Sequence, residues 1–113
     1  MTTIVNKRLI IAKYALTTPE VEYTANGCRT IIDKFTGTNQ NSVPVELSIL
    51  ILPPGGLSSS AEFRLLNRKE IASRATWMCP EVVGHVLEPN ESLVVLASLG
   101  ASITIRASGR EIT

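Results

Sequence analysis

The feature of this sequence that most limits its fold is the repeated alternation of apolar and polar residues with a period of two. Residues 102–108 and 20–24 are the clearest cases. Successive side chains of a β-strand point to opposite faces of its sheet, so this period predicts strands with one buried face and one wet face. The residues predicted to face the core are Ile103, Ile105 and Ala107 in the first segment and Val21 and Tyr23 in the second.

The strongest local turn signal is Asn26-Gly27, which closely follows residues 20–24. These two residue types readily adopt the positive φ angles that both central positions of a type I′ turn require. We therefore predict a hairpin between residues 20–24 and the next strand-like segment, residues 28–36.

Further strand-like segments are separated by turn signals along the rest of the chain. Residues 43–52 are apolar on more than one face, which predicts a central strand. The other predicted strands are residues 63–66, 75–79, 82–87 and 92–98, and residues 53–60, rich in Pro, Gly and Ser, predict an exposed loop. Eight or nine short strands indicate an all-β protein, a two-sheet antiparallel β-sandwich, for which jelly-roll connectivity is one arrangement that fits.

Length and charge restrict the classes of partner. We predict a single domain over residues 1–113, because a chain of this length can bury a core of its own. Lys and Arg number 11 and Asp and Glu number 10, without a basic stripe, which argues against nucleic acid. The apolar run 47–52 is far shorter than the roughly 20 residues of a membrane helix, so no membrane partner is expected. Lys13 interrupts the apolar run 9–12 too early for a signal peptide, so we expect a soluble protein made and kept in the cytosol.

Two cysteines, Cys28 and Cys79, could form a disulfide or remain free. A chain made in a reducing compartment normally keeps its thiols reduced, where they pack as small apolar side chains. We predict two free, buried thiols. Their spacing does not match a zinc-finger pattern.

The residues needed for catalysis are scarce. His85 is the only histidine and Asp33 the only aspartate, and no Gly-x-Ser-x-Gly motif accompanies them. One histidine cannot supply the several ligands of a cupin-type metal centre. Gly55-Gly56 is not followed by the Lys-Ser/Thr of a phosphate loop. We expect no catalytic residues, no cofactor and no metal, and therefore a protein that is not an enzyme.

Both ends of the chain offer residues for contacts with other subunits. Residues 1–8 form a candidate extended arm that could pair with the edge strand of a neighbouring subunit, and a frayed terminus is the alternative. Leu57 is an apolar residue within the predicted loop. The candidate interface residues are Thr3, Ile4, Val5, Arg8, Leu57, Arg110 and Ile112. For Trp77 we favour packing at the core or at one end of the sandwich over an exposed contact role.

Several of these segments together resemble a family of small tailed-phage virion proteins. The resemblance covers most of the chain and is carried by residues 79–88, 96–98 and 103–111, and by shorter motifs at residues 30–32, 38–39 and 52–56. These motifs mark turns, a loop and late strands. This chain departs from the family pattern at its Pro-Pro pair and at its Glu-Pro-Asn-Glu turn, so the resemblance does not transfer individual contacts.

The resemblance implies a phage virion structural protein. Small sandwich and jelly-roll proteins of this kind serve as capsid decoration or cement proteins on the capsid exterior. The partners implied are the major capsid protein and copies of this chain, in a dimer or trimer. The alternative is a head-to-tail connector, tail or fibre component, with a receptor-facing or glycan-facing surface that uses Trp77.

Overall fold

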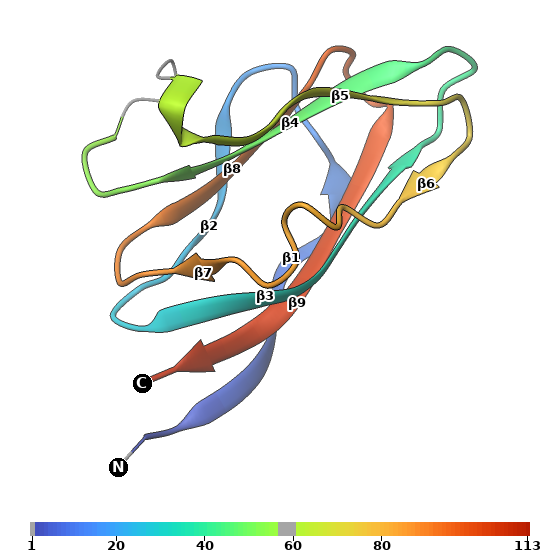
Figure 1. Ribbon diagram of the computed structural model, residues 1–113. Coiled ribbons are helices and arrows are strands. Elements are labelled where there is room, and N and C mark those ends of the chain that lie inside the picture. The colour runs from blue at the N-terminus through green and yellow to red at the C-terminus, as the bar shows by residue number, and fades with distance from the viewer. Residues whose placement is uncertain (1, 57–60) are drawn as a thin grey trace.

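The protein folds into two antiparallel β-sheets that face each other (Figure 1). The computed structural model describes residues 2–56 and 61–113. In these residues the chain forms nine strands and one short 3-10 helix, which confirms the predicted all-β sandwich. None of the described segments is a helix long and apolar enough to cross a membrane.

Strand order identifies the sandwich as a jelly roll. Sheet A contains, in spatial order, β1 (Ile4–Tyr14), β9 (Ile103–Ile112), β3 (Arg29–Asn39) and β6 (Thr76–Trp77), and β7 (Val86–Leu87) also pairs with β3. Sheet B contains β2 (Glu20–Thr24), β8 (Ser92–Ala97), β4 (Val45–Leu52) and β5 (Arg64–Ile71), and the helix η1 covers Ala61–Phe63. With β6 and β7 counted as one interrupted strand, eight strands make up two four-stranded sheets, as in a jelly roll.

The core lies between the inner faces of the two sheets. Ile103, Ile105 and Ala107 of β9 are buried there, as their alternation predicts. Phe35 of β3 and Leu47 of β4, which belong to opposite sheets, are fully enclosed in the same cluster.

Strand β4 lies between β8 and β5 in sheet B. Both of its faces are buried, because one faces the core and the other carries a second apolar cluster. That cluster contains Leu50, Leu52 and Val94, and Phe63, the last residue of η1, packs against it. The prediction of a central strand at residues 43–52 is therefore confirmed.

The predicted hairpin at Asn26-Gly27 is wrong. β2 belongs to sheet B and β3 to sheet A, so the chain crosses between sheets here. Of the pair, only Gly27 has a positive φ, 68°, whereas a type I′ turn needs two such residues. The turn signal marks a change of direction, and it does not specify whether the next strand returns to the same sheet.

The inward position predicted for Val21 is also wrong. Tyr23 is buried, but Val21 is 56% exposed, because the ladder between β2 and β8 shifts register between these two residues. A β-bulge adds a residue and reverses the face of the side chains before it. Glu22 is turned inward instead, and its side chain is only 3% exposed.

The segments predicted as strands at residues 75–79 and 82–87 are mostly irregular. Only β6 and β7 are regular within them, and the chain between takes positive φ angles at Cys79 (47°) and Gly84 (91°). These conformations cannot continue an extended strand.

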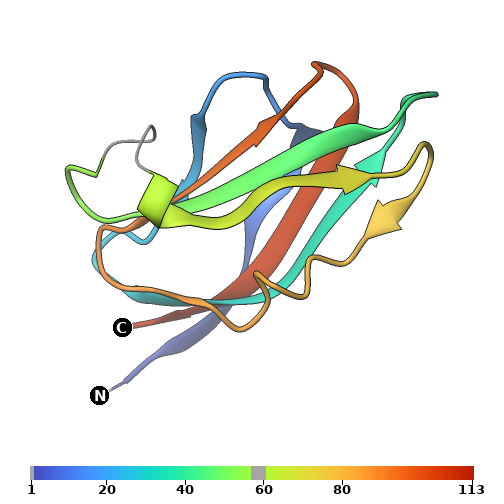
Figure 2. The ribbon, with the colours of Figure 1, turned by 45° about the horizontal axis from the view of Figure 1, so that its top comes forward.

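The two chain ends lie side by side at one end of the molecule (Figures 1 and 2). Residues 4–8 form the first half of β1 and pair with β9, so they are part of sheet A and not a separate arm. The tail 110–112 is likewise the end of β9.

Candidate functional site

The outer edge of β1 is the feature of the molecule best suited to bind another chain. β1 is the terminal strand of sheet A, and in the described residues it pairs only with β9. An unpaired edge presents a row of backbone donors and acceptors to a neighbouring strand.

The hydrogen bonds at the chain ends show which backbone groups are free. Thr3 and Thr113 exchange two backbone bonds, of 3.2 and 2.9 Å, so they are a closely bonded pair. In an antiparallel ladder such pairs alternate with pairs whose N–H and C=O groups point away from each other. Ile4, Asn6 and Arg8 are the residues that alternate with Thr3 in this way, so their backbone groups point to the free edge.

The straight part of this edge is short. The β1–β9 ladder shifts register between Arg8 and Ile10 and again between Ile10 and Lys13. Bulges increase strand twist and discourage a second strand from pairing. The segment of β1 that can accept a neighbouring strand is therefore residues 4–8.

Structure brings the predicted interface residues of the two chain ends together. Ile4 lies opposite Ile112, while Arg8 and Arg110 lie on neighbouring positions of the same ribbon. Ile4 and Val5 are apolar and 59% and 50% exposed. The six residues gathered here are Thr3, Ile4, Val5, Arg8, Arg110 and Ile112. Leu57 lies outside the described residues.

Arg110 is less available than the sequence suggests. Its guanidinium donates two bonds of 2.9 Å and one of 3.2 Å to the carboxylate of Asp33 on β3. This bidentate pair fixes the Arg110 side chain on the outer face of sheet A.

A polar network ties this ribbon to the opposite sheet. The Tyr23 hydroxyl of β2 donates to the carboxylate of Glu111 on β9 and accepts from the Thr30 hydroxyl at 2.7 Å. Lys7 of β1 adds an ion pair to Glu111 at 3.3 Å. The network thus links β1 to β9, and β9 in turn to β2 and β3, and nothing in the sequence pattern identifies these partners in advance.

The network shifts the pKa values of both Tyr23 and Glu111. Burial, with the adjacent Glu111, raises the pKa of the Tyr23 phenol well above its ordinary range. The hydrogen bond from Tyr23, with the Lys7 ammonium, lowers the pKa of Glu111. Tyr23 therefore remains a donor and Glu111 a carboxylate at neutral pH.

The side chains considered for catalysis do not form a cluster. Asp33 is engaged by Arg110, and His85 is exposed. In residues 2–56 and 61–113, no three His, Cys, Asp or Glu side chains lie close enough together to hold a metal ion. Trp77 packs partly buried against the core, as predicted, and the Lys69 ammonium lies 5.5 Å from its ring centroid.

Both thiols are free and buried, which confirms the prediction for the cysteines. Burial, with the nearby Glu81 carboxylate, raises the pKa of Cys79 to about 12. A thiol in this state is a poor nucleophile, because only the thiolate reacts.

The comparisons with known proteins give a match of fold and no match of sequence family. Neither a known family model nor a curated protein sequence matches the chain. The chain resembles a solved structure of a Bacillus endospore appendage, from a family described as disulfide-linked pili. The TM-score is 0.60 and the identity 16%, over 100% of this chain and 90% of the other. This likeness supports the sandwich architecture of sheets A and B.

Proposed function

We propose that this protein is a structural subunit of a phage particle, a capsid decoration or cement protein, that binds neighbouring subunits by strand addition at residues 4–8 of β1. The observation that carries the proposal is the free edge of β1. It combines outward backbone groups with exposed Ile4 and Val5. Strand addition draws its affinity from backbone hydrogen bonds and its register from alternate side chains.

Two further points support a role in assembly. The motifs at residues 79–88, 96–98 and 103–111 imply a virion protein by their resemblance to that family, and the fold is similar to that of a Bacillus endospore appendage. The partners we propose are copies of this chain and the major capsid protein.

An appendage subunit is the second candidate, favoured by the structural neighbour. That neighbour is described as one of a family of disulfide-linked pili. In this chain Cys28 and Cys79 are both buried, and the raised pKa of Cys79 keeps its thiol protonated and unreactive at neutral pH. We therefore propose a non-covalent assembly for this chain in either setting. A head-to-tail connector, tail or fibre position remains a further alternative within the phage particle.

A proline substitution tests the edge directly. Asn6→Pro removes one outward N–H of β1 and leaves the bonds between β1 and β9 in place. We expect Asn6→Pro to abolish concentration-dependent self-association in analytical ultracentrifugation while the melting temperature stays close to that of the unchanged protein. Asn6→Ala, which keeps the N–H, is the matched control and should associate normally.

Two results would contradict edge pairing. One is an Asn6→Pro variant that associates as strongly as the unchanged chain, and the other is a wild-type protein that remains monomeric at every concentration. Val5→Pro gives a useful contrast, because it removes a bond to β9 and should lower the melting temperature itself.

Copy number tests the placement on the particle. Quantitative mass spectrometry of purified particles would give the abundance of this chain relative to the major capsid protein. A near-stoichiometric ratio supports decoration, a few copies per hundred supports a joint or tail position, and absence rejects the virion proposal.

A further inference from the structure

The outer face of sheet A carries a cluster of positive charge that meets the free edge of β1 only at Arg8. Arg8 and Lys34 lie opposite Ser108 on the two strands that flank β9. Arg106 precedes Ser108 by two residues and shares its face of the sheet. Directly opposite side chains on neighbouring strands have Cβ atoms about 5 Å apart. Three cationic residues therefore lie on three adjacent strands, at or next to the position of one small residue, Ser108.

None of these three cations has an acidic partner in the described residues. The ion pairs of this face and its rim involve Arg110 with Asp33 and Arg29 with Glu88. Neighbouring like charges on a sheet face are unfavourable unless an anion lies between them. The cluster is thus suited to bind a negatively charged group from outside the chain.

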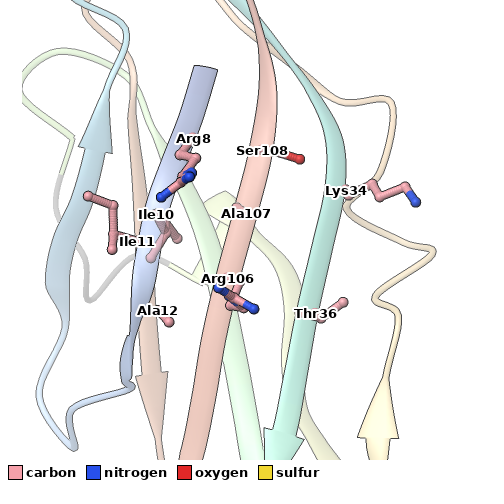
Figure 3. A pocket seen from close by; sticks show the side chains of 9 residues that line it. All are labelled: Arg8, Ile10, Ile11, Ala12, Lys34, Thr36, Arg106, Ala107 and Ser108. Atoms are coloured by element: carbon pink, nitrogen blue, oxygen red, sulfur yellow. The ribbon is translucent and has the colours of Figure 1, made fainter. Parts of the chain in front are cut away.

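The cations line a hollow of about 260 Å³ whose other walls include Ile11, Thr36 and Ser108 (Figure 3). In this view Arg8 and Arg106 stand over β1 and β9, and Lys34 extends in the other direction, past β3. Ile11 at the rim of the hollow is 70% exposed. The hollow is therefore lined by both charged and apolar side chains.

A second hollow continues this surface across β3. It measures about 350 Å³ and shares Lys34 and Thr36 with the first. Its far wall is apolar and consists of Met78, Pro80 and Val83, with Met78 60% exposed. Methionine adapts to varied apolar side chains and is common at protein-binding surfaces.

We propose that this face of sheet A, from Ile11 across to Met78, binds an acidic segment of a different protein. Carboxylates of the segment contact Arg8 and Arg106, and an apolar side chain fills the hollow beside Met78. Charge complementarity argues for an acidic partner, and the apolar walls argue for a peptide. Nucleic acid fits less well, because its affinity comes from many phosphate contacts along a basic stripe, and the three cationic residues of this cluster lie around a single position, Ser108.

The test is a titration of the isotope-labelled full chain, followed by amide and methyl NMR signals, with capped synthetic peptides. The probe is a peptide with one leucine flanked by glutamates. The comparison probes have lysine in place of glutamate, or alanine in place of leucine. We expect the acidic leucine peptide to shift signals of Arg106, Ser108, Lys34 and Met78, and to bind more weakly as salt is raised.

Substitutions then locate the contacts. Arg106→Glu should weaken the acidic peptide by about tenfold or more, since it replaces attraction with repulsion. Arg106 lies on the central strand β9, so this variant leaves the free edge of β1 unchanged. Arg64→Glu, on β5 of the opposite sheet, is the charge-matched control and should bind as the unchanged protein does. The amide spectrum of each variant verifies that it is folded.

Four results would overturn the inference: no shifts with the acidic peptide, equal binding by the lysine peptide, full affinity in Arg106→Glu, or tighter binding of an oligothymidylate at the same residues. Inorganic phosphate is titrated separately. If phosphate displaces the peptide completely at equal concentration, the surface is a site for small anions and the peptide partner is rejected. The edge-pairing proposal is unaffected by any of these outcomes, because it is tested by Asn6→Pro.

Discussion

At the scale of single residues, the Tyr23 hydroxyl ties the C-terminal end of β9 to two other strands. It joins β2 to β9 through Glu111 and to β3 through Thr30. Tyr23 is only 8% exposed, so its hydroxyl has little contact with water and needs these hydrogen-bond partners.

We expect Tyr23→Phe to lower the free energy of unfolding by about 1–2 kcal/mol, since a hydrogen bond to a carboxylate is lost and Thr30 keeps only its weaker contact with the Cys28 thiol at 3.6 Å. Tyr14→Phe is the matched control, because Tyr14 is 47% exposed, and it should change stability by less than about 0.5 kcal/mol. Urea denaturation at neutral pH measures both. Equal stability of Tyr23→Phe and the unchanged protein would contradict the network.

The same pair sets a pH dependence. The hydrogen bond from Tyr23 lowers the pKa of Glu111 in the folded protein, so below about 4.3 the unfolded chain binds the proton more readily. The stabilisation is present above that ordinary pKa and is lost as pH falls through the lower folded value. We therefore expect the stability difference between Tyr23→Phe and the unchanged protein to shrink in acid. Urea titrations over a series of acidic pH values would show a constant difference if the prediction is wrong.

Gly109 is a second residue that the fold requires. A Cβ placed there would lie 2.1 Å from the backbone oxygen of Ile31 and 3.0 Å from Leu9. Gly109→Ala must push β9 and β3 apart, and we expect it to cost at least about 1–3 kcal/mol of unfolding free energy. Gly100→Ala is the control, since its Cβ would meet only Thr17 at 3.8 Å. Thermal denaturation of the two variants should differ clearly, and similar melting temperatures would contradict the close approach.

At the scale of elements, β1 and β2 meet where the two sheets come together at one side of the sandwich. The bulge in β2 turns Glu22 inward, and Lys13 of β1 pairs with it at 2.9 Å. One carboxylate oxygen of Glu22 has no hydrogen-bond partner in the described residues. The ion pair is therefore the main compensation for burying this carboxylate.

We expect Lys13→Met to destabilise the protein by about 1–2 kcal/mol, less than for a fully buried pair because Lys13 is 43% exposed. Adding Glu22→Gln to Lys13→Met should recover part of the loss, since no uncompensated charge remains. A double-mutant cycle measured by chemical denaturation gives the coupling. Simple additivity of the two changes would contradict an interaction between β1 and β2.

At the scale of the whole molecule, folding buries both thiols, Cys28 and Cys79, and so protects them from reagents in solution. We expect native protein to react with a thiol reagent at least about a hundredfold more slowly than protein unfolded in urea, since burial removes access and Cys79 is almost wholly protonated. Colorimetric thiol counting before and after unfolding measures this. Rapid labelling of the native protein would contradict it.

The sequence predicts which face of a strand is buried better than it predicts how the strands are connected. The period of two correctly places Ile103, Ile105 and Ala107 in the core, because alternation is a local property of an extended chain. It fails at Val21, because a bulge depends on the neighbouring strand, β8. The turn signal at Asn26-Gly27 also fails to predict the connection, because here the turn residues serve a crossing between sheets.

The sequence by itself determined that this protein is an all-β sandwich with free thiols and candidate contact residues at both chain ends. Those features depend on residue type and on spacing along the chain. Only the tertiary structure decided that the two ends pair as β1 and β9, that residues 4–8 leave one edge open, and that Arg8, Lys34 and Arg106 share one face. These relations join residues that are far apart in the chain. They are set by the register in which distant strands pair, and no local pattern specifies that register.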